Sequence, residues 1–158
     1  MEGSELLIYI IPGFFLFFAA MWLGIIKLLS VLGWSKYVDD RAMITEPPPD
    51  AQKFSMQTMT IGGGIFFPIN YANCLNGWVH STGVFLRPAF MFKLFHPMLH
   101  YRWNQIESVE PATAILSKRF KMTVRRDLRP FMIYGALGKA VHDGWMQQRG
   151  RQSGSASI

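Results

Sequence analysis

The stretch LLIYIIPGFFLFFAAMWLGII, residues 6–26, contains no charged side chain, and its apolar character continues to about Leu32. An α-helix rises about 1.5 Å per residue, so a run of this length matches a hydrocarbon core about 30 Å thick. We therefore expect one membrane-spanning helix over residues 6–32, preceded by a short flank at residues 1–5.

A cleaved signal peptide is the alternative reading of this stretch. Such a peptide begins with a basic region, has a shorter apolar segment of about 7–15 residues, and ends at a small-residue cleavage site. Here the flank carries Glu2 and Glu5 and no Lys or Arg, and the small pair Ala19-Ala20 lies in the middle of the run. The pattern favours a retained anchor.

Basic residues next to the apolar run predict its orientation. The N-terminal flank has none, whereas Lys27, Lys36 and Arg41 follow the run. The positive-inside rule then places the N-terminus outside and the remaining chain in the cytoplasm. Trp22 and Trp34 are candidate interfacial side chains, of which Trp34 is the better placed.

The sequence after the anchor divides into three parts. Residues 33–54 form a juxtamembrane linker with the triple proline Pro47-Pro48-Pro49, which favours a stiff, extended spacer. Residues 55–149 are long enough for one small domain. Residues 150–158 are rich in Gly, Ser and Gln and are expected to be a flexible tail. The lone Cys74 has no disulfide partner and is expected to be a small buried hydrophobe.

Strand signals dominate the domain. Apolar alternation, β-branched residues and turn residues predict short strands at residues 59–67, 72–81, 84–87, 99–103, 113–118, 120–125 and 130–134. The triplet Gly62-Gly63-Gly64 interrupts the first of these and suggests a bulge or a close approach of the backbone. From Leu137 the period changes to three and four, which predicts an amphipathic helix ending near Arg149.

Two stretches resemble a PH-like domain of the pleckstrin-homology or GRAM type: GWVHSTGVFL at residues 77–86 and HPMLHYRWNQIESV at residues 96–109. The resemblance implies a barrel of about seven strands capped by a C-terminal helix, with Val141 and Trp145 in or against the core. It also implies that Trp103 and Ile106 plug the end opposite that helix. Arg102 departs from the pattern, which usually has a proline there.

A PH-like domain implies a non-enzymatic binding module for lipid head groups or protein segments. Members that bind phosphoinositides usually carry basic residues between their first two strands, but residues 68–73 contain none. Beyond residue 54 the chain has twelve Lys and Arg against four Asp and Glu, a net charge near +8. Six basic residues are expected to bind an anionic surface: Lys118, Arg119, Lys121, Arg125, Arg126 and Arg129.

Other classes of function have little support. No zinc site, recognition helix or base-stacking motif accompanies the basic residues, so nucleic acid is not an expected partner. His96 and His100 are four residues apart, but Pro97 lies between them and the segment resembles a strand, so a metal site is not expected. The glycine triplet lacks the Lys and Ser or Thr of a phosphate-binding loop. We therefore expect no catalytic residues and no cofactor.

Two functional hypotheses remain. The first is a membrane-anchored module that docks to anionic lipid head groups or to an acidic protein segment. The second is an accessory subunit whose anchor packs against a larger membrane complex. Gly13, Ala20 and Gly24 share one face of the anchor, and small residues allow close approach of helices.

Overall fold

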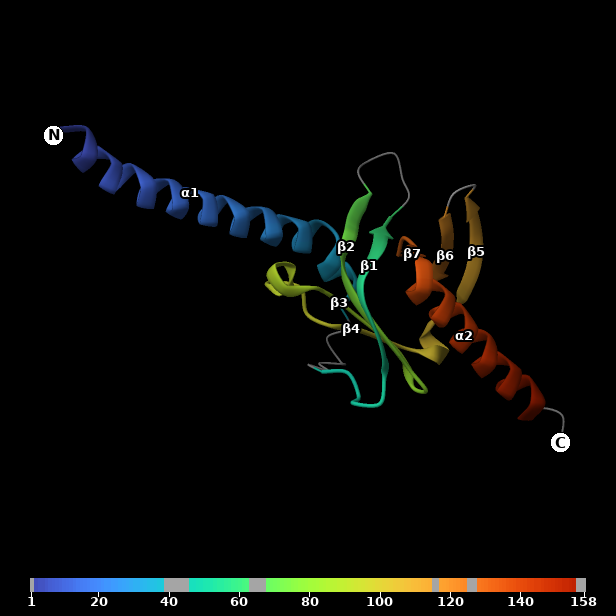
Figure 1. The fold of residues 1–158 in the computed structure, drawn as a ribbon. Coiled ribbons are helices and arrows are strands. Elements are labelled where there is room, and N and C mark those ends of the chain that lie inside the picture. Colours follow the sequence, from blue (N-terminus) through green and yellow to red (C-terminus); the bar gives the residue numbers. More distant parts are fainter. Residues whose placement is uncertain (1, 39–45, 63–67, 115–116, 125–127, 156–158) are drawn as a thin grey trace.

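The computed structural model describes residues 2–38, 46–62, 68–114, 117–124 and 128–155 (Figure 1). Its elements are, in chain order, α1 (Glu2–Leu32), the 3₁₀ turn η1 (Trp34–Tyr37), β1 (Gln52–Ile61), β2 (Ile69–His80), β3 (Gly83–Pro88), η2 (Phe90–Lys93), β4 (Leu99–Arg102), η3 (Trp103–Gln105), β5 (Ser108–Ala114), β6 (Ser117–Thr123), β7 (Phe131–Tyr134) and α2 (Gly135–Ser155).

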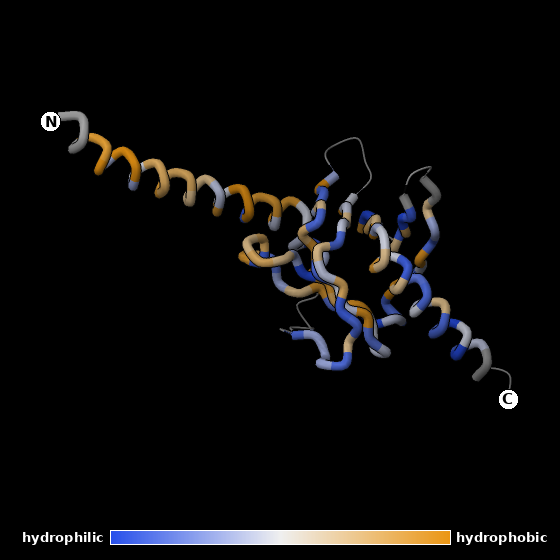
Figure 2. The backbone as a smooth tube through the Cα atoms, viewed as in Figure 1, coloured by the Kyte–Doolittle hydropathy of each residue, from blue (hydrophilic) through white to orange (hydrophobic). Residues whose placement is uncertain are grey.

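The N-terminal helix α1 projects from the rest of the molecule as a long apolar rod (Figure 2). It is long and apolar enough to cross a membrane, and its large side chains from Leu6 to Phe18 are exposed. Pro12 lies within the helix, near its N-terminal end. An exposed surface of this kind is stable only when hydrocarbon or another apolar surface covers it.

The seven strands form one antiparallel sheet in the order β4-β3-β2-β1-β7-β6-β5. The sheet curls into a half-barrel, because β1 pairs with β2 along one flank and with β7 along the other. The predicted fold class is confirmed: an apolar N-terminal helix, a mainly-β domain of seven strands, and a C-terminal helix. This order is consistent with a PH-like arrangement.

The helix α2 covers one end of the half-barrel and completes its core. Leu137 and Val141 are fully buried, and Trp145 donates a hydrogen bond from Nε1 to the carbonyl oxygen of Ile106 at 3.2 Å. The predicted core positions Trp103, Ile106, Val141 and Trp145 are all buried. A Cβ at Gly144 would lie 2.7 Å from the Trp103 ring, so helix and ring are in close contact.

These contacts correct one expectation from the resemblance. Trp103 and Ile106 were expected at the end of the barrel opposite the C-terminal helix. They lie at the same end, because Trp145 bonds to Ile106 and Gly144 packs on Trp103. α2 itself continues to Ser155, into the segment predicted to be a tail.

The turn η1 also corrects the sequence-based prediction. Trp34, expected at the membrane interface, is completely buried in the domain core. Its Nε1 donates to the carbonyl oxygen of Pro97 at 2.7 Å, and its ring packs against Tyr71 and His96. Tyr37 is buried beside it and donates its hydroxyl proton to the carbonyl oxygen of Arg129 at 2.9 Å. The turn that follows α1 is therefore part of the domain.

Two strands were placed wrongly from the sequence. A strand was predicted at residues 59–67, but β1 is Gln52–Ile61, and residues 63–67 fall outside the described residues. Another was predicted at residues 113–118, but β5 is Ser108–Ala114 and β6 begins at Ser117. Pro111 obscured β5, since proline interrupts a strand pattern. β5 tolerates it because it is an edge strand of the sheet. The bulge expected at the glycine triplet is wrong at Gly62, which follows the last residue of β1. The register shifts of β1 lie between Phe54 and Met59, and Gly63 and Gly64 fall outside the described residues.

Candidate functional site

A pocket of about 730 Å³ lies where the β2–β3 turn, β4, η3 and α2 meet the linker. Its lining combines carboxylate, hydroxyl, amide, imidazole and guanidinium groups with two large aromatic rings. The lining residues are Glu46, Pro47, Pro48, Ser81, Thr82, Phe85, His100, Arg102, Trp103, Asn104, Gln148 and Gln152. A few polar groups converging on an apolar wall are typical of binding sites.

The β2–β3 turn forms one wall, and Gly83 is required for it. The backbone at Gly83 has φ of +157°, and a Cβ there would lie 2.1 Å from the carbonyl oxygen of Tyr101. Only glycine allows this close approach between β3 and β4. The turn is thereby held directly against the strand that carries His100 and Arg102.

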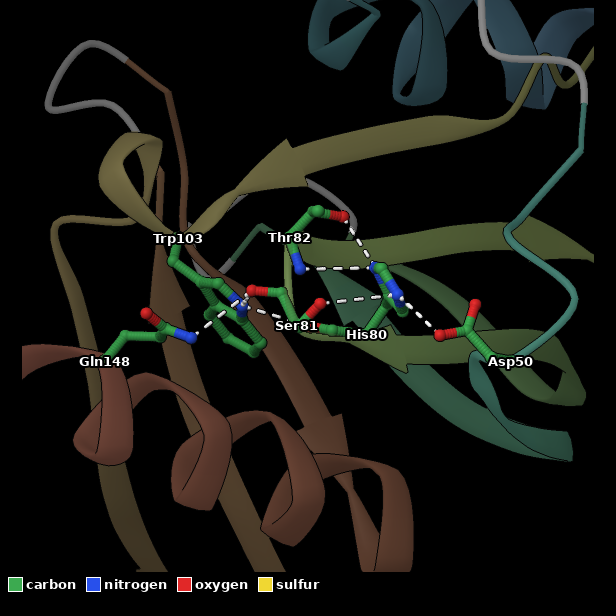
Figure 3. Close-up of polar contacts among 6 residues, drawn as sticks. All are labelled: Asp50, His80, Ser81, Thr82, Trp103 and Gln148. Carbon is green, nitrogen blue, oxygen red and sulfur yellow. Dashed lines mark hydrogen bonds and ion pairs between the residues drawn. The ribbon is translucent and has the colours of Figure 1, made fainter. Parts of the chain in front are cut away.

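His80 fixes the other half of the turn (Figure 3). The backbone N–H of Thr82 donates to Nδ1 of His80 at 3.2 Å, so in the neutral ring the proton lies on Nε2. Nε2 is 3.0 Å from Oδ2 of Asp50 and 3.3 Å from Oγ of Ser81. The imidazole therefore links the turn to the linker at Asp50.

This trio differs from a catalytic Ser-His-Asp relay. A relay uses both ring nitrogens, one facing the carboxylate and the other facing the nucleophile. Here Asp50 and Ser81 approach the same nitrogen, and Nδ1 of His80 is occupied by Thr82 (Figure 3). Oγ of Ser81 can accept a hydrogen bond from Nε2, but Nε2 already carries the proton of the neutral ring and so cannot act as a base toward Ser81. The geometry supports a positioning role for His80.

Trp103 and Gln148 connect the turn to α2. Nε1 of Trp103 donates to the carbonyl oxygens of His80 at 3.1 Å and Ser81 at 2.9 Å. Nε2 of Gln148 donates to the carbonyl oxygen of Ser81 at 3.3 Å. These bonds satisfy the turn carbonyls and leave the hydroxyls of Ser81 and Thr82 at the pocket wall.

His100 is the most unusual group in the pocket wall. Its side chain is buried, and Nε2 has no hydrogen-bond partner among the described residues. Its ring stacks on Phe85 at 4.3 Å between centroids and 9° between planes. Burial lowers the pKa of the His100 imidazole, and the positive charge of Arg102 lowers it further. A buried polar atom without a partner is costly, and a ligand hydrogen bond would satisfy it.

We predict that His100 makes the protein less stable in acid. Its pKa is depressed in the folded state, so below the unfolded value of about 6.5 the unfolded chain binds more protons. Stability is therefore retained above that value and lost as pH falls through it. Thermal unfolding of the full-length protein between pH 7 and pH 5 should show a weaker pH dependence for His100→Gln than for the wild type.

Asn104→Ala is the matched control for this measurement, because Asn104 lines the same pocket and carries no titrating group. It should retain the wild-type pH dependence. If thermal unfolding of His100→Gln depends on pH as strongly as that of the wild type, other groups cause the loss of stability in acid.

Four of the six basic residues predicted to bind an anionic surface lie in the described part of the chain. Lys118, Arg119 and Lys121 lie on β6, next to the edge strand β5 and on the side of the domain away from α1 (Figure 1). Arg129 lies near Gly62 and Tyr37, at the junction with η1. The remaining two, Arg125 and Arg126, fall outside the described residues. Binding of an anionic surface by this set stays a prediction.

Metal and thiol chemistry have little geometric support. No group of three His, Cys, Asp or Glu side chains that could hold a metal occurs among the residues described. His96 instead contacts the hydroxyl of Tyr71 at 3.1 Å and the carbonyl oxygen of Leu94 at 2.9 Å. Cys74 is half-buried against the core, and burial raises the pKa of its thiol. A raised thiol pKa disfavours the reactive thiolate.

Sequence reasoning singled out Arg102 as a departure from the PH-like pattern but did not predict the pocket. The only signal for the pocket in the sequence was Arg102 itself, a polar residue at a position where the PH-like pattern usually has a proline. No protein-family model matches the chain, and no curated protein matches it.

Proposed function

We propose that the protein is a non-enzymatic, membrane-anchored binding module in which a PH-like domain holds an acidic, extended protein segment in the pocket beside Arg102. In this proposal α1 crosses the bilayer once, with the N-terminus outside and the domain in the cytoplasm. The length and apolar surface of α1, and the basic residues Lys27 and Lys36 that follow its apolar run, support this orientation.

One observation carries the choice of ligand: this end of the domain already holds an acidic, proline-rich segment of its own chain. Asp50 of the linker contacts Nε2 of His80 at 3.0 Å, and residues 46–48 form a wall of the pocket. The same pocket is also lined by Arg102, by the buried His100 and by several residues with hydroxyl and amide groups. A second acidic segment would find there a guanidinium for its carboxylate and donors for its backbone.

The position of the pocket favours a protein segment over a lipid head group. α2, which supplies Gln148 and Gln152 to the wall, lies on the side of the domain away from α1 (Figure 1). A bilayer crossed by α1 would therefore face another part of the domain. The basic residues of β6 lie on that far side too, where they would attract an acidic partner over about one Debye length.

The test is a titration of the full-length protein in detergent micelles with a fluorescein-labelled Glu-Glu-Pro-Glu-Glu peptide. Arg102→Gln should weaken binding, because losing a hydrogen bond to a charged group costs about 1.5–3 kcal/mol, roughly a ten- to hundredfold rise in Kd. Arg102 is exposed, so its replacement should leave the unfolding midpoint unchanged. The matching Gln-Gln-Pro-Gln-Gln peptide should bind far more weakly.

Lys118→Gln is the matched control, since it removes the same charge from the exposed surface of β6. It should weaken binding only slightly and reduce its salt dependence. Equal losses in the two variants would mean that general charge, rather than the pocket, binds the peptide. A stoichiometric membrane partner that copurifies regardless of Arg102 would instead favour the accessory-subunit hypothesis.

A further inference from the structure

The connection between β3 and β4 exposes an unusual set of apolar side chains. Phe90 is 88% exposed, and Met91, Leu94 and Phe95 are about half exposed. All lie in or next to η2, within the sequence AFMFKLF at residues 89–95. Contiguous exposed apolar groups on a protein surface generally mark a contact with a membrane or another protein.

The backbone of this connection is fixed at its C-terminal end. The hydroxyl of Ser30 donates to the carbonyl oxygen of Phe95, and Nε1 of Trp34 donates to the carbonyl oxygen of Pro97 at 2.7 Å. At the other end, the N–H of Ala89 donates to the carbonyl oxygen of Cys74 at 2.6 Å. These bonds hold the segment in place and prevent its side chains from turning into the core.

Two residues of the segment have backbone conformations that L-amino acids rarely adopt. Phe90 has φ of +38° and Phe95 has φ of +62°. Such conformations persist where the surroundings impose them, and they are common at functional sites. The exposure of the Phe90 and Phe95 side chains is thus built into the fold.

The segment continues the apolar surface of α1. The rings of Trp22 and Phe92 are 5.5 Å apart, so η2 packs against the helix within its apolar run. The hydropathy colouring shows the same apolar character in α1 and in the neighbouring loop (Figure 2). Trp22 precedes Lys27 by five residues, which places it about 7.5 Å farther along the axis, on the apolar side.

We propose that residues 90–95 form a second membrane contact, a short apolar wedge that enters the lipid leaflet nearest the domain alongside α1. The proposal rests on the membrane anchorage proposed above for α1. The position of Trp22, about 7.5 Å to the apolar side of Lys27, fits the depth of such a contact. Interfacial segments bury their apolar side about 5–10 Å into the boundary between head groups and acyl chains. Lys93 and Lys27 are exposed and would extend their ammonium groups to the phosphates.

The size of the surface favours lipid over a protein partner. A stable protein interface buries about 1,200–2,000 Å² in total, more than six residues on a short turn supply. Insertion into hydrocarbon needs no complementary surface, because each exposed apolar side chain gains free energy by leaving water on its own. The wedge would also limit rotation of the domain about α1 and so keep the pocket directed away from the bilayer.

The test is site-directed spin labelling of the full-length protein in phosphatidylcholine liposomes, in a Cys74→Ala background. Nitroxides are attached at Phe90→Cys and, as a second site with ordinary backbone geometry, at Leu94→Cys. The collision rate with oxygen, which concentrates in lipid, is compared with that of nickel ethylenediaminediacetate, which remains in water. We expect a ratio of oxygen to nickel collisions severalfold higher at both sites than at Met146→Cys, an exposed position on α2.

A label at Phe17→Cys, an exposed position of α1, separates the two proposals. High oxygen collision at Phe17 with high nickel collision at Phe90 and Leu94 would overturn the wedge while leaving the anchor intact. High nickel collision at Phe17 would overturn the anchor and the wedge together. Immobile labels at Phe90 and Leu94 with few collisions of either kind would show that protein covers the segment, which also overturns the proposal.

Discussion

Replacing Trp34 with alanine is expected to unfold most of the domain, although Trp34 lies only two residues after the apolar helix α1. Its side chain is completely buried in the core. Truncating a buried Trp typically costs about 3–5 kcal/mol, against a total stability of about 5–15 kcal/mol. The change also leaves the carbonyl oxygen of Pro97 without the indole donor. Guanidinium titration of the full-length protein in micelles, followed by near-ultraviolet circular dichroism, measures the loss.

Trp22→Ala is the matched control for this experiment. Trp22 lies within α1 and its ring contacts Phe92, but it is not part of the core. Its replacement should shift the unfolding midpoint far less than Trp34→Ala. Comparable shifts in the two variants would mean that Trp34 is not buried in the domain.

The second large effect is expected for Trp145→Ala in α2. Trp145 is buried against the barrel end, donates to Ile106, and stacks under the guanidinium of Arg149 at 4.8 Å. Its loss should cost about 3–5 kcal/mol and detach the C-terminal part of α2 from the end of the sheet. Limited proteolysis should then cleave the variant after Lys139 and Arg149 at protease concentrations that leave the wild type intact.

Met146→Ala provides the comparison for Trp145→Ala, since Met146 is the next residue and is exposed. Its proteolysis pattern should match that of the wild type. If Trp145→Ala also resists cleavage, the helix does not depend on that side chain for its position.

The sequence predicted those elements whose signal lies within a single stretch of the chain. The uncharged run to Ile26 corresponds to α1, and the strand predicted at residues 120–125 overlaps β6, where Phe120 and Met122 are buried. Pro111 concealed β5, since the tolerance of an edge strand for proline is a property of the sheet and not of the segment.

Features made by distant segments were missed for a different reason. Trp34 has the sequence context of an interfacial residue, and only the folded chain brings it against Tyr71 and His96. The pocket likewise joins the linker, the β2–β3 turn, β4, η3 and α2, so no single stretch carries its signal. The apolar residues at 90–95 are too few to show a helical or strand period.

The burial of Trp34 and Tyr37 bears on how the protein would be turned over. A protease that cut the linker near Glu46 would separate the strands and α2 from both side chains, and so would open the core in which those side chains are buried. We expect the released fragment to unfold and be degraded, rather than persist as a soluble form of the domain. Quality-control proteases could then remove the domain after a single cut, and any pool of domain detached from α1 would be short-lived.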